Sequence, residues 1–204
     1  MNKSYFLRWP SWQDKSLEFK LRILYESLMI NWQPTLTGKF LYLRPLAESD
    51  FDVLFLAAQD PLIWEQHPDR NRYLRDRFQI YFDSALKSSG ALVIQDQKSG
   101  EVIGSSRFYN FADFDKSVEI GFTFLIRKYW GTAYNQELKR LMLDYAFQFV
   151  QTVYFVVGIN NFRSRRAMEK IGGVLVMDHS KLPLEKSLKD SVAYEIKRTY
   201  KSAL

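Results

Sequence analysis

The chain has 204 residues, of which 47% are hydrophobic and 16% aromatic, so it can bury one sizeable core. It contains no cysteine, which excludes disulfides, thiolate metal sites and a cysteine nucleophile and favours the reducing cytoplasm. With two histidines and no apolar run near the roughly 18 residues of a membrane span, neither a metal centre nor a membrane protein is expected. The net charge of +6 fits ordinary solubility or a small polyanionic ligand. Nucleic acid is not expected, because the chain lacks blocks of interleaved basic and aromatic residues.

Residues 1–32 are interpreted as an extension that precedes the main domain, residues 33–204. A stripe of apolar residues at helical spacing predicts an amphipathic helix over Trp12–Ile30; the stripe is Leu17, Leu21, Leu24, Tyr25 and Leu28. Charged residues interrupt this helix throughout, so it is not a secretion signal. It packs either on the domain or on a second subunit, which would make the protein a homodimer. Alternatively, the native chain starts at Met29.

Strand and helix patterns alternate in the main domain, and hairpins join three consecutive strands in its middle. The predicted strands are Lys39–Leu46, Ala91–Gln95, Val102–Tyr109, Val118–Ile126, Thr152–Gly158, Val174–Met177 and Val192–Lys197. The predicted helices begin at Ser49, near Leu74, after Ala133 and at Asn161. We read Asp60-Pro61 as a helix end and Leu62–Arg70 as a loop. The pattern predicts an α/β fold with a mixed, mostly antiparallel sheet of about seven strands and helices on both faces.

The central stretch is the strand Val118–Ile126, the turn Arg127–Ala133 and the helix that follows. The first amides of a helix lack backbone partners and carry partial positive charge. Gly131 and Ala133 leave room beside these amides, and Arg127 and Lys128 add full positive charges. This arrangement predicts a phosphate or pyrophosphate site. It matches neither the P-loop nor the dinucleotide fingerprint, and a purely structural turn is the alternative.

A second motif follows the strand Thr152–Gly158: Asn161 and Ser164 open a helix that ends in Glu169-Lys170-Ile171-Gly172. The two motifs together resemble those of the GNAT superfamily of acyl-CoA-dependent N-acetyltransferases, roughly [QR]-x-x-G-x-[GA] followed by N-x-x-[SA] and E-K-x-G. The resemblance covers about Leu41 to Ile196. Tyr129-Trp130-Gly131 and the segment Asp60–Gly90 look most like the branch that contains ribosomal-protein N-terminal acetyltransferases.

The resemblance implies a splayed pair of parallel strands that holds acetyl-CoA as co-substrate, and direct transfer to a primary amine without a metal. It places the pantetheine and the thioester carbonyl against the backbone of Phe124, Leu125 and Ile126. It places the pyrophosphate on Lys128 and on the amides of Trp130, Gly131, Thr132, Ala133 and Tyr134. Asn161 is expected to cap its helix and, by resemblance, to bond to the pantetheine or to a water in the site. Arg166, with Arg163 and Arg165, is expected to reach the 3′-phosphate, unless these side chains form only a solvated basic face.

The candidate general base is Glu119, which strand alternation places opposite Val118, Ile120 and Phe122 and together with Thr123. Its structural alternative is an ion pair with Arg107, a residue that we also expect near the acceptor. Rival groups are Glu65 and His67, which lie with Trp64 in a loop that the resemblance places over the acceptor amine.

The candidate general acid is Ser164; alternatively, Ser164 only caps or opens its helix, and the leaving thiolate takes a proton from water. Many GNAT enzymes carry a tyrosine at the position that corresponds to Met168, which has no proton to give. This departure favours a second hypothesis, in which the protein binds acyl-CoA as a sensor or interaction module without turnover.

Overall fold

The computed structural model describes residues 30–112, 115–178, 182 and 188–198. Contacts divide the chain after Asn31, and the account below concerns the second unit, Trp32–Leu204. Apart from Ile30, the predicted helix Trp12–Ile30 lies outside the described residues. No helix in the described part of the chain is both long enough and apolar enough to cross a bilayer.

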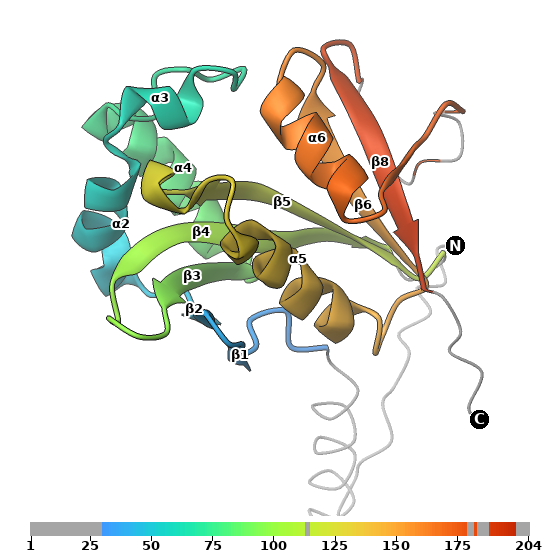
Figure 1. The fold of residues 1–204 in the computed structure, drawn as a ribbon, viewed down its shortest axis with the longest axis horizontal. Coiled ribbons are helices and arrows are strands. Elements are labelled where there is room, and N and C mark those ends of the chain that lie inside the picture. Colours follow the sequence, from blue (N-terminus) through green and yellow to red (C-terminus); the bar gives the residue numbers. More distant parts are fainter. Residues whose placement is uncertain (1–29, 113–114, 179–181, 183–187, 199–204) are drawn as a thin grey trace, which may run out of the picture. The chain divides into compact units, whose positions relative to one another are not determined.

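An eight-stranded sheet is covered by helices on both faces (Figure 1). The strands are β1 (Leu36–Thr37), β2 (Leu41–Pro45), β3 (Ala91–Asp96), β4 (Val102–Ala112), β5 (Ser117–Leu125), β6 (Thr152–Gly158), β7 (Val174–Leu175) and β8 (Ser191–Lys197). The helices are η1 (Glu48–Asp50), α2 (Phe51–Ala58), α3 (Pro61–Trp64), α4 (Arg75–Lys87), η2 (Arg127–Tyr129), α5 (Ala133–Ala146) and α6 (Phe162–Lys170). The strand order is β1-β2-β3-β4-β5-β6-β8-β7, and only β5 and β6 run parallel. The predicted fold class is confirmed, with the short β1 as an eighth strand.

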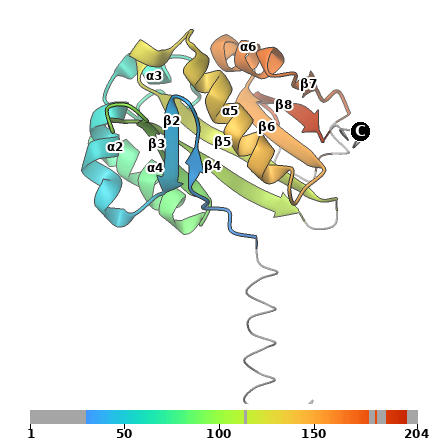
Figure 2. The ribbon, with the colours of Figure 1, turned by 60° about the horizontal axis from the view of Figure 1, so that its bottom comes forward.

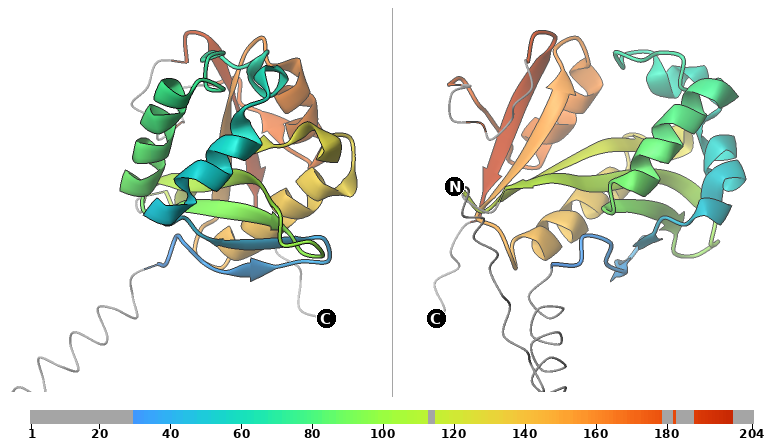
Figure 3. Two further views of the ribbon diagram at one scale, coloured as in Figure 1. Left: turned by 90° about the vertical axis from the view of Figure 1, so that its left-hand side faces the viewer. Right: turned by 180° about the vertical axis from the view of Figure 1, so that it is seen from behind.

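Two apolar clusters hold the helices against the sheet. Val118 and Ile120 of β5 pack with Leu138 and Met142 of α5. Phe124 belongs instead to the cluster formed by α2, α3 and α4. Figures 2 and 3 show α5 on one side of the sheet and α2 and α4 on the other. The sheet therefore separates two environments, and β5 contributes side chains to both.

The simple alternation predicted for β5 is wrong beyond Gly121, because the strand contains a bulge. The register with β4 shifts between Ser105 and Arg107, and Phe122 adopts a φ of 53°. One extra residue turns the following side chains to the opposite face. Phe122 consequently lies beside Arg107, 4.0 Å from the guanidinium carbon to the ring centroid, whereas Thr123 points to α5 and accepts a hydrogen bond from Lys139. Glu119 and Thr123 thus lie on opposite faces, not on one.

The parallel pair β5–β6 is short and then opens. Its last paired residues are Glu119 and Tyr154, although both strands continue, β5 to Leu125 and β6 to Gly158. Figure 1 shows the two strands parting from a common point, and Figure 3 shows the same divergence from behind. The expected splayed pair is therefore present, and it opens toward the turn before α5.

The α-helix α3 was not predicted. Asp60-Pro61 also begins α3, because the Asp60 side chain accepts the Leu62 N–H at 3.0 Å and proline occupies the first helical turn. The segment read as the loop Leu62–Arg70 accordingly begins in a helix. The prediction of strand Val174–Met177 was too long, since β7 ends at Leu175.

Candidate active site

The turn between β5 and α5 is open where an anion would approach. Gly131 has a φ of 72°, and a Cβ built on it would meet no atom within 4 Å. Thr132 is the N-cap of α5; its hydroxyl accepts the Tyr134 N–H and donates to the Tyr129 carbonyl. Gly131, Thr132 and Ala133 are exposed. The 14-residue helix α5 thus presents its positive end at an unobstructed surface.

The basic residues of this turn have carboxylate partners. Lys128 Nζ lies 2.5 Å from Glu101 Oε2, and both side chains are about half exposed. Arg127 pairs with Asp60. The carboxylate of Glu101 and the neighbouring phenol of Tyr129 raise the pKa of Lys128, which therefore stays charged. Exposed ion pairs contribute little stability, so a phosphate can replace Glu101 at small cost.

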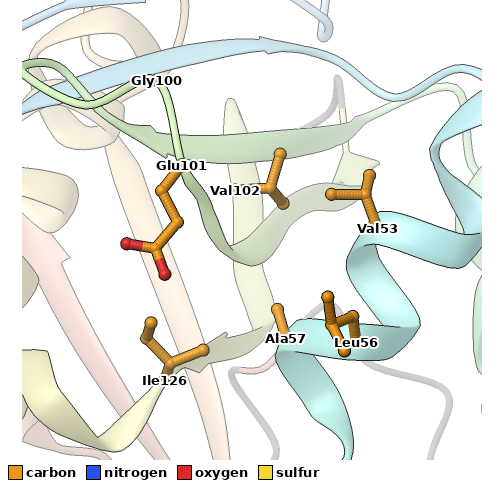
Figure 4. A pocket seen from close by; sticks show the side chains of 7 residues that line it. All are labelled: Val53, Leu56, Ala57, Gly100, Glu101, Val102 and Ile126. Atoms are coloured by element: carbon orange, nitrogen blue, oxygen red, sulfur yellow. The ribbon is translucent and has the colours of Figure 1, made fainter.

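A pocket of about 380 Å³ adjoins this turn on the side of α2 (Figure 4). Its lining residues are Val53, Leu56, Ala57, Gly100, Glu101, Val102 and Ile126. The pocket shares Glu101 with the Lys128 ion pair, but neither Gly131 nor Thr132 lines it. We therefore regard it as a neighbour of the predicted phosphate site and not as that site itself.

Trp130 lies beyond the end of β5, at the open end of the splay. Its indole Nε1 donates to the Leu125 carbonyl at 2.8 Å, and its ring packs against both apolar clusters. The Arg163 guanidinium lies 3.9 Å from the Trp130 ring centroid and donates to the Ile63 carbonyl at 2.8 Å. Trp130 and Arg163 thus connect β5, α3 and α6 at the open end of the splay.

The start of α6 has the predicted cap. The buried Asn161 side chain accepts the Ser164 N–H at 3.1 Å. Ser164 is partly buried and Arg166 is exposed. Arg165 bonds instead to the Tyr194 hydroxyl and the Ile159 carbonyl.

Met168 occupies the position where many GNAT enzymes have a tyrosine. It is 5% exposed and belongs to the apolar cluster that contains Leu138 and Met142 of α5. It fills an apolar site, and its thioether has no proton to donate.

Glu119 is 2% exposed and lies at the apex of the splay, as the last β5 residue paired with β6. Asn110 Nδ2 donates to its Oε1 at 2.6 Å. Burial, and then the nearby charge of Glu119 and a hydrogen bond to it, raise the pKa of the Tyr109 hydroxyl, which keeps its proton. Glu119 is therefore a buried acceptor oriented by two donors.

Arg107 lies on the same face and is 3% exposed. Its terminal nitrogens contact the Ser84 carbonyl at 3.1 Å and the Tyr81 carbonyl at 3.4 Å. Its Nε has no hydrogen-bond partner among the described residues. Burial lowers the pKa of the guanidinium, but arginine remains charged in proteins.

The three loop residues predicted to lie over the acceptor amine differ in exposure. Trp64 is buried and donates its indole N–H to the Ala58 carbonyl at 2.8 Å, whereas Glu65 is exposed. His67 Nδ1 lies 2.9 Å from the Asp69 backbone nitrogen and 3.2 Å from the Asp69 carbonyl oxygen. Burial, and next the charge of Arg72, lower the pKa of His67 to about 4. The ring is thus neutral near pH 7, and Asp69 occupies its Nδ1.

Lys139 is a buried, charged residue that sequence reasoning missed. It is 3% exposed in the middle of α5. Its position directly after Leu138 and one turn before Leu143 was the available signal, because both neighbours face the core.

Comparisons with known proteins agree on the fold. A family model described as an acetyltransferase (GNAT) domain matches residues 41–174. A GCN5-related N-acetyltransferase from Brucella melitensis has a TM-score of 0.67 at 20% identity, covering 81% of this chain and 79% of that one. RimJ from Mycobacterium smegmatis, in complex with CoA-disulfide, has a TM-score of 0.62 at 17% identity, with 82% and 88% covered. Spermidine N-acetyltransferase from Vibrio cholerae, in complex with CoA and spermine, has a TM-score of 0.59 at 16% identity, with 78% and 96% covered. A search of the curated proteins found no match.

Proposed function

Because this chain belongs to the GNAT family of acetyltransferases, we propose that it transfers an acetyl group from acetyl-CoA directly to a primary amine. The observation that carries this proposal is the parting of β5 from β6 directly before the open Gly131 turn. The acceptor amine belongs to a small molecule or to a protein N-terminus. We place the enzyme in the reducing cytoplasm, in keeping with a chain without cysteine.

The residues at the splay fit acetyl-CoA. The α5 N-terminus is exposed and carries no side chain at Gly131, as a pyrophosphate requires. In the proposal, Lys128 and residues 130–134 hold the pyrophosphate, and the backbone of residues 124–126 lines the pantetheine. Asn161 contacts the pantetheine, and the exposed Arg166 reaches the 3′-phosphate. When bound, acetyl-CoA supplies an acyl group activated as a thioester.

The protein's own groups then orient and deprotonate the amine. Glu119 is the general base, and Asn110 and Tyr109 hold its carboxylate at the apex of the splay. Backbone N–H groups of β5 beyond the last β6 pair polarise the reacting carbonyl. The ring of Trp130 and the guanidinium of Arg163 exclude water from the open end.

The acceptor approaches from the side of α3 and α4 in this proposal. Trp64 shapes this side, Glu65 and His67 face the incoming amine, and the buried Arg107 supplies an unpaired Nε–H. The solved relatives include a spermidine N-acetyltransferase and RimJ. We favour the RimJ-like branch because Tyr129-Trp130-Gly131 and the segment 60–90 resemble it.

A second candidate function is an acyl-CoA sensor without turnover. The observation that favours it is Met168, which fills an apolar site and has no proton to give. Single-turnover mixing with a pool of amines separates the two functions. Acetylated product supports the enzyme, and tight cofactor binding with no product supports the sensor.

A thermal-shift titration with acetyl-CoA tests both functions, with ATP and NAD⁺ as controls. A ligand that binds only the folded state at 100 times its dissociation constant adds about 2.7 kcal/mol of stability. A rise in Tm specific to acetyl-CoA is expected. No shift at millimolar acetyl-CoA would refute both functions, because each requires the cofactor.

A further inference from the structure

The Lys139 side chain ends at the splay between β5 and β6. Its Nζ donates to Thr123 Oγ1 at 2.7 Å and lies 5.3 Å from the ring centroid of Phe155. Thr123 belongs to β5 and Phe155 to β6, and both residues follow the last parallel pair, Glu119 with Tyr154. The amine of Lys139 is therefore located where the two strands have separated, on the α5 face of the sheet.

This amine has fewer partners than its chemistry requires. A protonated lysine donates three hydrogen bonds, yet Thr123 is its one hydrogen-bond acceptor among the described residues. Thr123 Oγ1 in turn contacts Ser106 Oγ at 2.7 Å, and Ser106 is fully buried. A buried ammonium with unused donors is costly, and such a group in a ligand-binding gap marks a functional site.

The nearby charged groups do not neutralise Lys139. On α5, Glu137 accepts the backbone N–H groups of Lys39, Phe40 and Leu41, and Arg140 is exposed. On β5, Glu119 lies on the opposite face. Burial is the cause that lowers the pKa of Lys139 to about 7, so the amine holds a proton that it can release near neutral pH.

We propose that Lys139 donates the proton to the sulfur leaving group of the acetyl transfer, a task for which Met168 has no proton. This inference rests on the proposed function. As the acceptor nitrogen forms its bond to the carbonyl carbon, the carbon–sulfur bond breaks and its electron pair passes to sulfur. Lys139 Nζ gives its proton to that sulfur, and Glu119 accepts the proton that the amine loses. Lys139 recovers a proton from solvent when the products leave.

This assignment places the base and the acid on opposite faces of β5. The bulge at Phe122 makes this possible, since it turns Thr123, and with it the contact to Lys139, away from the face of Glu119. Proton removal and proton donation are thus separated by the strand, and the two groups do not neutralise each other.

The test measures, by ultraviolet absorbance, the fraction of bound CoA that is thiolate at pH 7. A neighbouring ammonium favours the thiolate, so the full-length wild-type protein should raise this fraction by about tenfold or more over free CoA. Lys139→Met should return it to the value of free CoA. Lys87→Met, which removes an exposed lysine of α4, should behave as wild type.

Lys139→Arg separates a proton donor from a simple positive charge. Arginine keeps the charge but does not release its proton at neutral pH. This variant should therefore retain the raised thiolate fraction while kcat falls about 100-fold. Wild-type kcat in Lys139→Arg would overturn the proposal, as would a thiolate fraction in the wild-type complex equal to that of free CoA. Failure of wild-type protein to bind CoA would overturn the proposed function as well, whereas an unchanged thiolate fraction with CoA bound overturns this inference alone.

Discussion

Arg163 stacks on Trp130, with 3.9 Å between its guanidinium carbon and the ring centroid. The same guanidinium donates to the Ile63 carbonyl, and the Arg163 N–H donates to Gln66 Oε1 at 3.1 Å. Through its side chain and its backbone N–H, this one residue of α6 therefore connects the turn that precedes α5 with α3 and the residues after it. These are the segments that border the open end of the splay.

Replacing Arg163 should weaken cofactor binding more than folding. Arg163→Met removes the cation–π contact and the bond to Ile63, so Trp130 and Ile63 of α3 lose their common partner. We expect the KM for acetyl-CoA to rise about tenfold, which corresponds to about 1.4 kcal/mol. Arg165→Met is the matched control on the same helix, because Arg165 bonds to Tyr194 and Ile159 instead. Equal KM values for the two variants would contradict the role assigned to Arg163.

Gly131→Val tests the phosphate site directly. The φ of 72° costs a β-branched residue about 1–2 kcal/mol, but no atom lies near the new Cβ, so the protein should still fold. The added methyl groups stand where the pyrophosphate is proposed to approach. We expect a slightly lower Tm and a loss of the acetyl-CoA-induced thermal shift. A shift of wild-type size would show that the phosphates bind elsewhere.

Glu119→Gln should abolish most turnover and leave cofactor binding intact. The amide keeps the shape of the side chain but cannot accept the proton of the amine, so kcat should fall about 100-fold or more. Asp144→Asn provides a carboxylate control on the exposed face of α5. Rates for Glu119→Gln that match wild type across the pH range would remove Glu119 from the role of base.

The order of strands and helices could be predicted from the sequence because hairpin spacing, caps and apolar periodicity are local signals. Asn161 caps α6 as its residue type indicates, and Gly172 has the positive φ expected after a helix. The bulge in β5 gave no such signal, because phenylalanine has no preference for the left-handed conformation that Phe122 adopts. Strand alternation therefore placed Thr123 with Glu119.

Which side chains lie on each face of the sheet was harder to predict, because the bulge in β5 decides it. Lysine in a helix is ordinarily solvated, and only the position of Thr123 after the bulge provides Lys139 with a buried partner.

The start of α3, in contrast, could have been predicted from Asp60-Pro61. Aspartate followed by proline begins a helix as readily as it follows one, and Asp60 caps α3 with its side chain.

His67 should not set the pH dependence of the reaction. Its lowered pKa of about 4 keeps the ring neutral, and protonation starts only as the pH falls toward that value. His67→Gln should therefore leave the shape of the kcat/KM profile unchanged from about pH 6 to pH 9, whatever its effect on the rate. Loss of a kinetic pKa near 6–7 in His67→Gln would show that the ring titrates during turnover.

The last prediction concerns stability, which reports on Lys139 without any ligand. The folded-state pKa of about 7 lies below the ordinary lysine value of 10.5. Between these values the unfolded chain binds a proton that the folded chain lacks, so stability rises with pH across this window. Below about pH 7 both states are protonated, and the folded state bears the full cost of the buried charge.

Lys139→Met removes this titration while keeping a long, flexible side chain. The variant should therefore melt at a higher temperature than wild type near pH 6, and the difference should shrink as the pH approaches 10. Subtracting one protein from the other cancels the surface lysines and tyrosines, which titrate equally in both. A difference in Tm that does not change between pH 6 and pH 10 would mean that Lys139 has an ordinary pKa in the folded protein. In that case its amine would be a poor proton donor at neutral pH, because its proton would be held too tightly.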